Sequence, residues 1–263
     1  MPPSALDHAT VRDLIRAARP ERVVRLIGKS HPADLAPLFK DLAPDHVRFL
    51  FDLLLSIRRA DKTLKELPPD LLPDILAVVE DEKIARMISR AVPDDAVTFI
   101  DALPEERRDK ILELLEPAAR EKLRRLISYP EGSAGRIMST DYLALPPRMT
   151  SQQAIDTIRE RGELETFFYL YVVDESGRLA GVVPLRNLVI APPGRTLADM
   201  MIPNPVRAAA DMGQEEAARL VSRYELLALP IVDADGRLLG IITTDDVIDI
   251  IDKAGTEDMY KMA

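Results

Sequence analysis

Two copies of one hairpin-like sequence constrain the fold of this chain more than any other feature. The first copy, LYVVDESGRLAGVVPLRNLVI, spans 170–190, and the second, LPIVDADGRLLGIITTDDVID, spans 229–249. Each reads as an apolar run, a turn that contains Asp and Gly, a second apolar run and the start of a helix, which predicts a β-hairpin. Because the pattern occurs twice, it predicts an internal structural repeat.

A similar order precedes each hairpin. Each copy begins with a methionine and a short extended piece, at 142–145 in the first copy and at 206–208 in the second. A helical segment follows, at 151–161 and at 214–224 respectively. The second half of the chain therefore predicts two consecutive modules of the order β-α-β-β-α.

The first half of the chain has a different periodicity. From about residue 7 to residue 128, apolar residues recur at steps of three and four, which is typical of helices. Prolines mark the predicted helix starts, where a missing N–H is harmless: Pro44, Pro69, Pro93, Pro104 and Pro117. The spacing predicts a superhelical stack of short helices, so the fold class is α + α/β, with the stack followed by the tandem modules.

The composition excludes several classes of function. The chain has no Cys, so a disulfide framework and a thiolate metal site are both excluded. Its 44 acidic residues outnumber its 35 basic residues, which disfavours nucleic-acid binding. No apolar stretch is long enough for a membrane span, and no signal peptide is visible. We find no nucleophile–base pairing, His-rich metal site or Gly-rich phosphate loop, so we expect no enzyme.

Acidic residues are concentrated near the C-terminal end. Between 225 and 258 nine acidic residues face only two basic ones. One interpretation is a solvated face. The other is a surface that repels itself unless divalent cations neutralise it. Asp245, Asp249 and Asp252 follow the spacing i, i+4, i+7, which places three carboxylates on one helix face, and Mg²⁺ is a hard cation that prefers such oxygen ligands.

The segment between the two halves, YPEGSAGRIM at 129–138, carries a resemblance to a known family. It resembles the joint of MgtE-type magnesium transporters, between their helical N domain and their paired CBS (cystathionine-β-synthase-type) domains. The string TEDMY at 256–260 resembles the start of the helix that leads such proteins into their membrane domain. The expected domains are a helical N domain at 1–129, the joint at 130–136, CBS modules at 137–199 and 200–252, and the start of the connecting helix at 253–263.

This resemblance implies a function and a set of ligands. The chain is expected to be a Mg²⁺-sensing regulatory region at the cytoplasmic face of the membrane. Its expected partners are a second copy, through the CBS modules, and a transmembrane domain of the same polypeptide. The resemblance and the acidic helix together give the candidate Mg²⁺ ligands: Asp94, Asp95, Glu215, Glu225, Asp245, Asp246, Asp249, Glu257 and Asp258. An acidic position of the family is Thr98 in this chain, and another falls near Lys62, so Asp61 or Asp95 is expected to substitute.

A second hypothesis is adenine-nucleotide sensing, with ATP or AMP as the ligand. CBS pairs often hold such a nucleotide with a G-h-h-T-x-x-D string, and the second copy has this string at 240–246. The first copy departs from it, with Pro184 in place of Thr and Asn187 in place of Asp. The resemblance gives these candidate nucleotide residues: Tyr169, Arg186, Asn187, Leu226, Thr243 and Asp246. Helix capping is a simpler role for Thr243 and Asp246.

Overall fold

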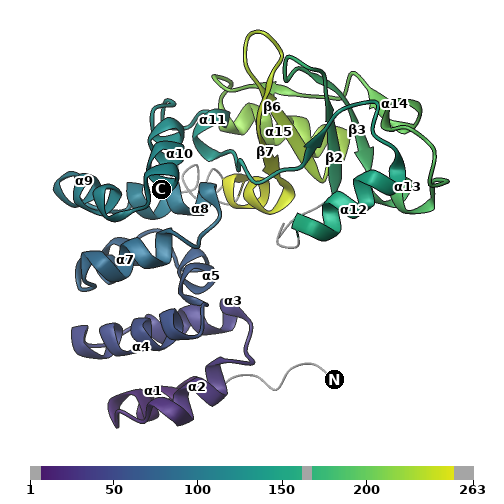
Figure 1. The fold of residues 1–263 in the computed structure, drawn as a ribbon. Coiled ribbons are helices and arrows are strands. Elements are labelled where there is room, and N and C mark those ends of the chain that lie inside the picture. The colour runs from purple at the N-terminus through teal and green to yellow at the C-terminus, as the bar shows by residue number, and fades with distance from the viewer. Residues whose placement is uncertain (1–6, 162–167, 252–263) are drawn as a thin grey trace. The chain divides into compact units, whose positions relative to one another are not determined.

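The computed structural model of this protein describes residues 7–161 and 168–251. It divides into two compact units, Met1–Leu123 and Arg124–Ala263 (Figure 1). None of the helices within the described residues is both long enough and apolar enough to cross a membrane.

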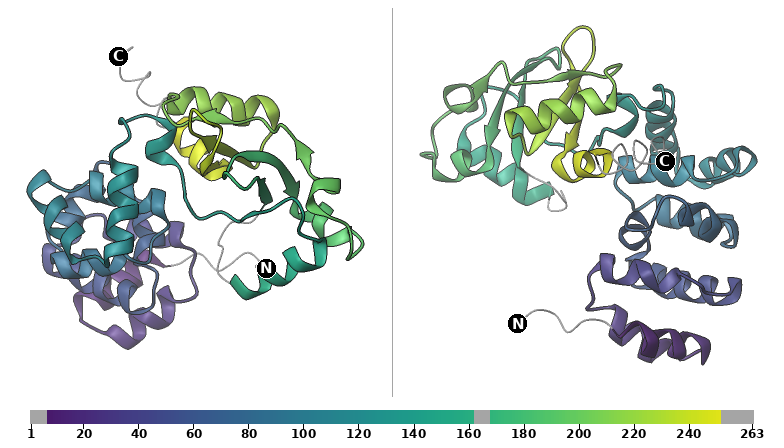
Figure 2. Two further views of the ribbon diagram at one scale, coloured as in Figure 1. Left: turned by 45° about the horizontal axis from the view of Figure 1, so that its top comes forward. Right: turned by 180° about the vertical axis from the view of Figure 1, so that it is seen from behind.

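Short helices make up the first unit. They are α1 (His8–Arg16), α2 (Pro20–Ile27), α3 (Pro32–Leu35), the 3₁₀ helix η1 (Ala36–Phe39), α4 (Pro44–Ser56), α5 (Ala60–Lys65), α6 (Leu71–Ala77), α7 (Asp81–Ile88), α8 (Pro93–Asp101), α9 (Glu105–Leu114) and α10 (Pro117–Ile127), which continues into the second unit. Helix α1 packs on α4, α4 on α7 and α7 on α9, so the helices form successive layers (Figures 1 and 2). The predicted stack of short helices is therefore confirmed.

The predicted helix starts agree with most of the observed ones. Helices α4, α8 and α10 begin at Pro44, Pro93 and Pro117, and α9 begins directly after Pro104. Helix α6 differs, because it begins at Leu71, after a turn in which the Leu71 and Leu72 amides donate to the carbonyl of Pro68.

Arginine side chains connect successive helical layers. Arg59, at the start of α5, donates to the carbonyl of Gly28 at the end of α2, over 2.8 Å. Arg107 in α9 donates to the carbonyls of Leu76 and Val79, over 2.8 and 2.7 Å. Carbonyls at or just beyond a helix end have few donors within the helix, so these guanidinium groups supply further donors there. The stack is thereby tied by polar bonds as well as by apolar packing.

The second unit contains both predicted modules. Its elements are α11 (Ala134–Ile137), β1 (Ala144–Leu145), α12 (Ser151–Arg161), β2 (Tyr169–Val173), β3 (Leu179–Pro184), α13 (Leu185–Ile190), α14 (Leu197–Met200), β4 (Ile202–Pro203), β5 (Ala208–Ala209), α15 (Gln214–Tyr224), β6 (Ala228–Val232), β7 (Leu238–Thr243) and a helix over 244–251. The predicted fold class is confirmed, and α12 and α15 have the predicted bounds.

The two hairpins lie in two sheets of matching topology. One sheet has the strand order β1-β2-β3-β4 and the other β5-β6-β7. In each sheet the first strand is parallel to the second, and the hairpin is antiparallel. The register shifts at the same place in both copies, between Val172 and Val173 and between Ile231 and Val232. The sequence repeat is therefore a repeat of structure down to its bulge.

The recurring Asp and Gly of the hairpins have a local explanation. The Asp174 carboxylate accepts from the backbone N–H groups of Ser176 and Arg178, over 2.8 and 2.9 Å. Asp233 makes the equivalent pair of bonds in the second copy. Gly177 has φ of 78°, a conformation that is costly for residues with a Cβ atom. The turn chemistry therefore fixes both hairpins locally.

Each hairpin also pairs with the segment that begins the other module. Strand β4, which leads into the second module, pairs with β3 of the first, with Val182 opposite Ile202. In return, Ser139, which leads into the first module, exchanges two backbone hydrogen bonds with Ile241 of β7, over 2.8 and 2.9 Å. The two modules are therefore interlocked rather than merely consecutive.

Two apolar clusters organise the second unit. The core of the first module contains Leu143, Leu145, Ala154, Leu170, Val172, Val183, Leu188, Leu197 and Met200. A second cluster joins residues of both hairpins: Tyr171, Leu179, Val182, Val232, Leu238 and Ile241. Because side chains alternate between the faces of a strand, β2 contributes Leu170 and Val172 to the module core and Tyr171 to the cluster between the modules.

The exchanged strand segment gives a test of the interlocked modules. A Cβ atom on Gly240 would lie 2.7 Å from the Ser139 carbonyl oxygen and 2.7 Å from the Met138 sulfur. We expect Gly240→Ala to lower the free energy of unfolding by about 1–3 kcal/mol, because the paired backbone must move apart. Urea denaturation measures this change.

Gly194→Ala is the matched control, since nothing lies within 4 Å of a Cβ atom there. It is expected to be neutral or to stabilise the protein by about 0.5 kcal/mol. Equal stability of the two variants would show that the segment 138–139 does not pair with β7.

Candidate functional site

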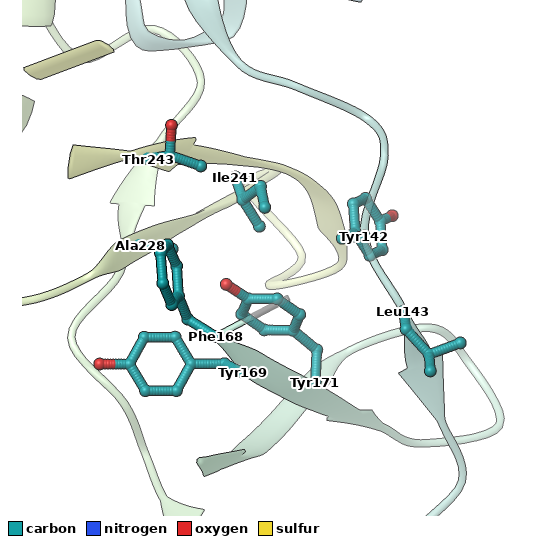
Figure 3. A pocket seen from close by; sticks show the side chains of 8 residues that line it. All are labelled: Tyr142, Leu143, Phe168, Tyr169, Tyr171, Ala228, Ile241 and Thr243. Carbon is teal, nitrogen blue, oxygen red and sulfur yellow. The ribbon is translucent and has the colours of Figure 1, made fainter. Parts of the chain in front are cut away.

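A cleft lies between the two modules, beside the apolar cluster that joins them. It is lined by Tyr142, Leu143, Phe168, Tyr169, Tyr171, Ala228, Ile241 and Thr243 (Figure 3). Its empty volume is about 240 Å³, including space open to solvent. Because this space includes open solvent, a bound nucleotide would extend beyond the cleft or widen it. Half of the lining residues are aromatic, which suits a planar ligand.

The hydroxyl groups of two lining tyrosines have backbone partners. Tyr142 donates to the carbonyl of Leu238 over 3.1 Å, and the Tyr169 hydroxyl accepts from the backbone N–H of Leu227 over 3.5 Å. The rings of Tyr142 and Tyr171 meet edge to face, with centroids 6.0 Å apart. These contacts hold the aromatic walls of the cleft in place.

Tyr171 differs from its neighbours. Its side chain is 1% exposed, and its hydroxyl has no hydrogen-bond partner within the part of the chain that the structure describes. Burial raises the pKa of Tyr171 well above the ordinary value, with a smaller contribution from Tyr169. The phenol is therefore neutral and keeps its proton as a hydrogen-bond donor.

Thr243, which lines the cleft, contacts two carboxylates. The Thr243 hydroxyl lies 2.6 Å from Asp246 Oδ2 and 2.5 Å from Asp245 Oδ1. The backbone N–H of Thr243 also donates to Asp246 Oδ2, over 3.2 Å. This last bond is the backward half of a capping box at the start of the helix over 244–251. The capping role expected for Thr243 and Asp246 is thus present in the structure.

The predicted nucleotide residues lie partly in this cleft. Tyr169 and Thr243 line it, and Asp246 contacts Thr243. Leu226 is not among the lining residues; its carbonyl accepts from Thr244 Oγ1, over 3.1 Å.

The other two candidates of the nucleotide set belong to α13. Arg186 and Asn187 are exposed in its first turn. The preceding Leu185 donates its N–H to the Phe168 carbonyl over 3.0 Å, which ties this turn to a lining residue.

Six lining residues were missed by sequence reasoning: Tyr142, Leu143, Phe168, Tyr171, Ala228 and Ile241. Two of them carried a usable signal. Tyr171 is two residues from Tyr169 on one strand, so both rings lie on the same face. Phe168 directly precedes that strand. The others come from segments that only the tertiary fold brings together.

The candidate metal ligands of the second unit are spread along two helices. Glu215 lies in the first turn of α15, with its carboxylate 3.4 Å from Arg219. Glu225 ends α15 in the left-handed conformation, with φ of 52°. Asp249 is exposed on the helix over 244–251. Glu257 and Asp258 lie outside the described residues, as does Asp252.

The candidate ligands of the first unit begin α8. Asp94 is 9% exposed. Asp95 forms an ion pair with Lys65 of α5, over 3.2 Å, with both side chains largely buried. Thr98, which was expected to replace an acid of the family, donates its hydroxyl to the backbone carbonyl of Asp94 over 3.2 Å. A cation at Asp95 would therefore compete with Lys65.

Carboxylates of the right kind are thus present, but they do not form a complete ligand set within one unit. Among the described residues, no three His, Asp or Glu side chains are grouped as a metal site. The adjacent carboxylates of Asp245 and Asp246 fit Mg²⁺ in donor type, because this ion is often held by one or two carboxylates together with waters.

Comparison with known proteins shows the family. The model of the MgtE intracellular N domain matches residues 30–132, and the CBS domain model matches 134–194 and 197–253. A solved structure, the cytosolic domain of the Mg²⁺ channel MgtE in complex with ATP, is 31% identical in sequence, with a TM-score of 0.86. The match covers 92% of this chain and 99% of that one. The chain belongs to the MgtE family.

Full-length relatives agree with this assignment. Magnesium transporter MgtE of Thermus thermophilus is 35% identical over 236 residues, which are 88% of this chain and 52% of the relative. Magnesium transporter MgtE of Bacillus subtilis is 30% identical over 239 residues, or 90% of this chain and 53% of the relative. The chain spans about half the length of the curated MgtE relatives it matches. The resemblance drawn from the joint at 129–138 is confirmed.

Proposed function

We propose that this chain is a non-catalytic, Mg²⁺-sensing regulatory region of a magnesium transporter or channel, at the cytoplasmic face of a membrane. Its membership of the MgtE family carries the proposal, together with its match to the cytosolic domain of the MgtE channel over nearly that domain's whole length. Transport itself would belong to a transmembrane domain of the same polypeptide.

Mg²⁺ would act by favouring one arrangement of the two units. A ligand shifts a conformational equilibrium only through its different affinities for the two states. An ion shared by carboxylates of both units has such a difference, because its site exists only in the compact state. Asp94 and Asp246 are the ligands proposed on the two sides, with Glu257 and Asp258 on the connecting helix. The compact state would correspond to a closed pore.

The charge distribution supports this mechanism. Nine acidic residues against two basic ones between 225 and 258 give a strongly negative segment. Removing Mg²⁺ leaves this charge unscreened, and like charges at short range favour separation. In the first unit the Lys65–Asp95 ion pair already neutralises one of the two neighbouring acids. A cation shared through Asp95 would have to displace that lysine.

Proteolysis across a Mg²⁺ titration tests this mechanism. We expect Mg²⁺ to slow cleavage within the joint at 130–136. Asp94→Asn combined with Asp246→Asn removes two charges and keeps hydrogen-bond acceptors for the cap at Thr243. This double variant should require at least about tenfold more Mg²⁺ for the same protection, equivalent to about 1.4 kcal/mol.

Asp109→Asn combined with Asp211→Asn is the matched control, with one exposed acid removed from each unit. It should respond to Mg²⁺ as the unmodified chain does. Cleavage that is insensitive to Mg²⁺ in the unmodified chain would contradict the mechanism. Equal responses of the two double variants would show that Asp94 and Asp246 are not the ligands.

We further propose that the CBS modules form a homodimer. The two closing helices of the modules expose large apolar side chains: Val189 at 65%, Ile190 at 71%, Ile248 at 54% and Ile251 at 51%. Large apolar side chains exposed on helices favour association with a partner surface. Sedimentation equilibrium should give twice the chain mass of 29.3 kDa, and a stable mass of one chain would contradict the dimer.

The second candidate function is adenine-nucleotide sensing, with Mg²⁺ incidental. The aromatic cleft beside Thr243 favours it, as does the match to a relative solved in complex with ATP. Calorimetry with ATP and with AMP, each with and without Mg²⁺, separates the candidates. We expect Mg²⁺ to produce compaction without nucleotide. Tight nucleotide binding with no Mg²⁺-dependent compaction would favour the second function over the first.

A further inference from the structure

The buried hydroxyl of Tyr171 is a hydrogen-bonding group that the structure leaves unused. Its side chain is 1% exposed, and its hydroxyl oxygen has no hydrogen-bond partner within the described residues. In Figure 3 this hydroxyl points among the other lining side chains, whereas those of Tyr142 and Tyr169 point away from the centre of the group. A buried polar group without a hydrogen bond is destabilising, so such groups usually have a partner in the functional state.

Water is a poor partner for this hydroxyl. A buried water is typically held by two to four polar groups. Leu143, Phe168, Ala228 and Ile241 contribute apolar side chains to the lining, and the Thr243 hydroxyl is already engaged with two carboxylates. A water molecule beside the Tyr171 hydroxyl would therefore have few hydrogen-bond partners other than the phenol itself.

A planar heteroaromatic base matches the cleft better. The rings of Phe168, Tyr169 and Tyr171 supply apolar walls, and a base carries acceptor nitrogens in the plane of its ring. The phenol of Tyr171 is a neutral donor over the physiological pH range, because burial raises its pKa. A donor at the edge of a stacked base can hydrogen-bond to the nitrogens of that base, but not to the phosphates of the nucleotide.

We propose that the Tyr171 hydroxyl donates a hydrogen bond to a ring nitrogen of the base of a nucleotide bound in this cleft, and so contributes to base recognition. This proposal rests on the nucleotide-binding function proposed above, and it assigns a specific role to a residue outside the G-h-h-T-x-x-D string. The phosphates would lie outside the aromatic part of the cleft. Removing the hydroxyl should weaken base binding and leave binding of the phosphates unchanged.

The test is a thermodynamic cycle that combines removal of the Tyr171 hydroxyl with removal of one ring nitrogen from the ligand. Calorimetry on the full chain measures ATP and its 1-deaza, 3-deaza and 7-deaza analogues, in which one ring nitrogen is replaced by CH. Tyr171→Phe should bind ATP about tenfold more weakly than the unmodified chain does. One of the three analogues should bind the unmodified chain more weakly than ATP does, by a similar factor. Tyr171→Phe should show no further loss with that analogue, because the bond is already absent.

Tyr224→Phe is the matched control, since it removes a hydroxyl from a tyrosine that is 49% exposed on α15. It should bind ATP as the unmodified chain does. The thermal midpoint without ligand should not fall in Tyr171→Phe, because the hydroxyl it removes makes no bond to the described residues. If that variant does not fold, the analogue series on the unmodified chain still decides, since the proposal requires one deaza analogue to bind weakly.

The outcomes are distinguishable. Failure of the unmodified chain to bind ATP would overturn both the nucleotide function and this inference. ATP binding with no difference between Tyr171→Phe and the unmodified chain would overturn the role of Tyr171 alone. Equal binding of ATP and all three deaza analogues to the unmodified chain would likewise overturn it, and would leave the nucleotide function standing.

Discussion

Reciprocal backbone pairing between the two hairpins is the constraint on which the second unit depends. The N–H of Leu179 donates to the carbonyl of Gly236, and the N–H of Leu238 donates to the carbonyl of Gly177, each over 3.0 Å. These equivalent bonds hold the two turns against each other, so the sheets meet face to face and bury the cluster around Tyr171. The cleft is the open margin of this contact. Its position follows from the repeat, whereas its chemistry follows from the side chains that each copy contributes.

Those side chains have diverged between the copies. At the end of its second strand, the second copy has Thr243, whose hydroxyl and N–H both engage carboxylates. The first copy has Pro184, which has neither group, and its following helix begins without a side-chain cap. The same backbone arrangement thus ends its second strand with a polar residue in the second copy, beside the cleft, and with an apolar residue at the equivalent position of the first copy. The two modules share a backbone scaffold, and different residues at the strand ends make them chemically different.

Features set by contacts between residues close in the sequence were predictable, whereas features set by tertiary contacts were not. The hairpins were predictable because Asp174 and Gly177 set their turn within five residues, and most helix starts were predictable from a single proline. The lining of the cleft was not, because Tyr142 comes from a loop and Ala228 from a strand far along the chain. Nor could the acidic pattern show that Asp95 is paired with Lys65 of another helix. Composition counts charges, but only the fold decides which of them are already neutralised.

Asp246 belongs to both sets of candidate ligands, and this overlap links the two proposed functions physically. Its carboxylate accepts from the backbone and hydroxyl of Thr243, which begins the helix over 244–251. A cation or a ribose bound at this carboxylate would compete with, or reinforce, a bond that orients the first turn of that helix. Two ligands that act on one element change each other's affinity by the same factor, whatever its size. If both bind, Mg²⁺ and nucleotide are therefore not independent inputs, because both would act on the start of one helix.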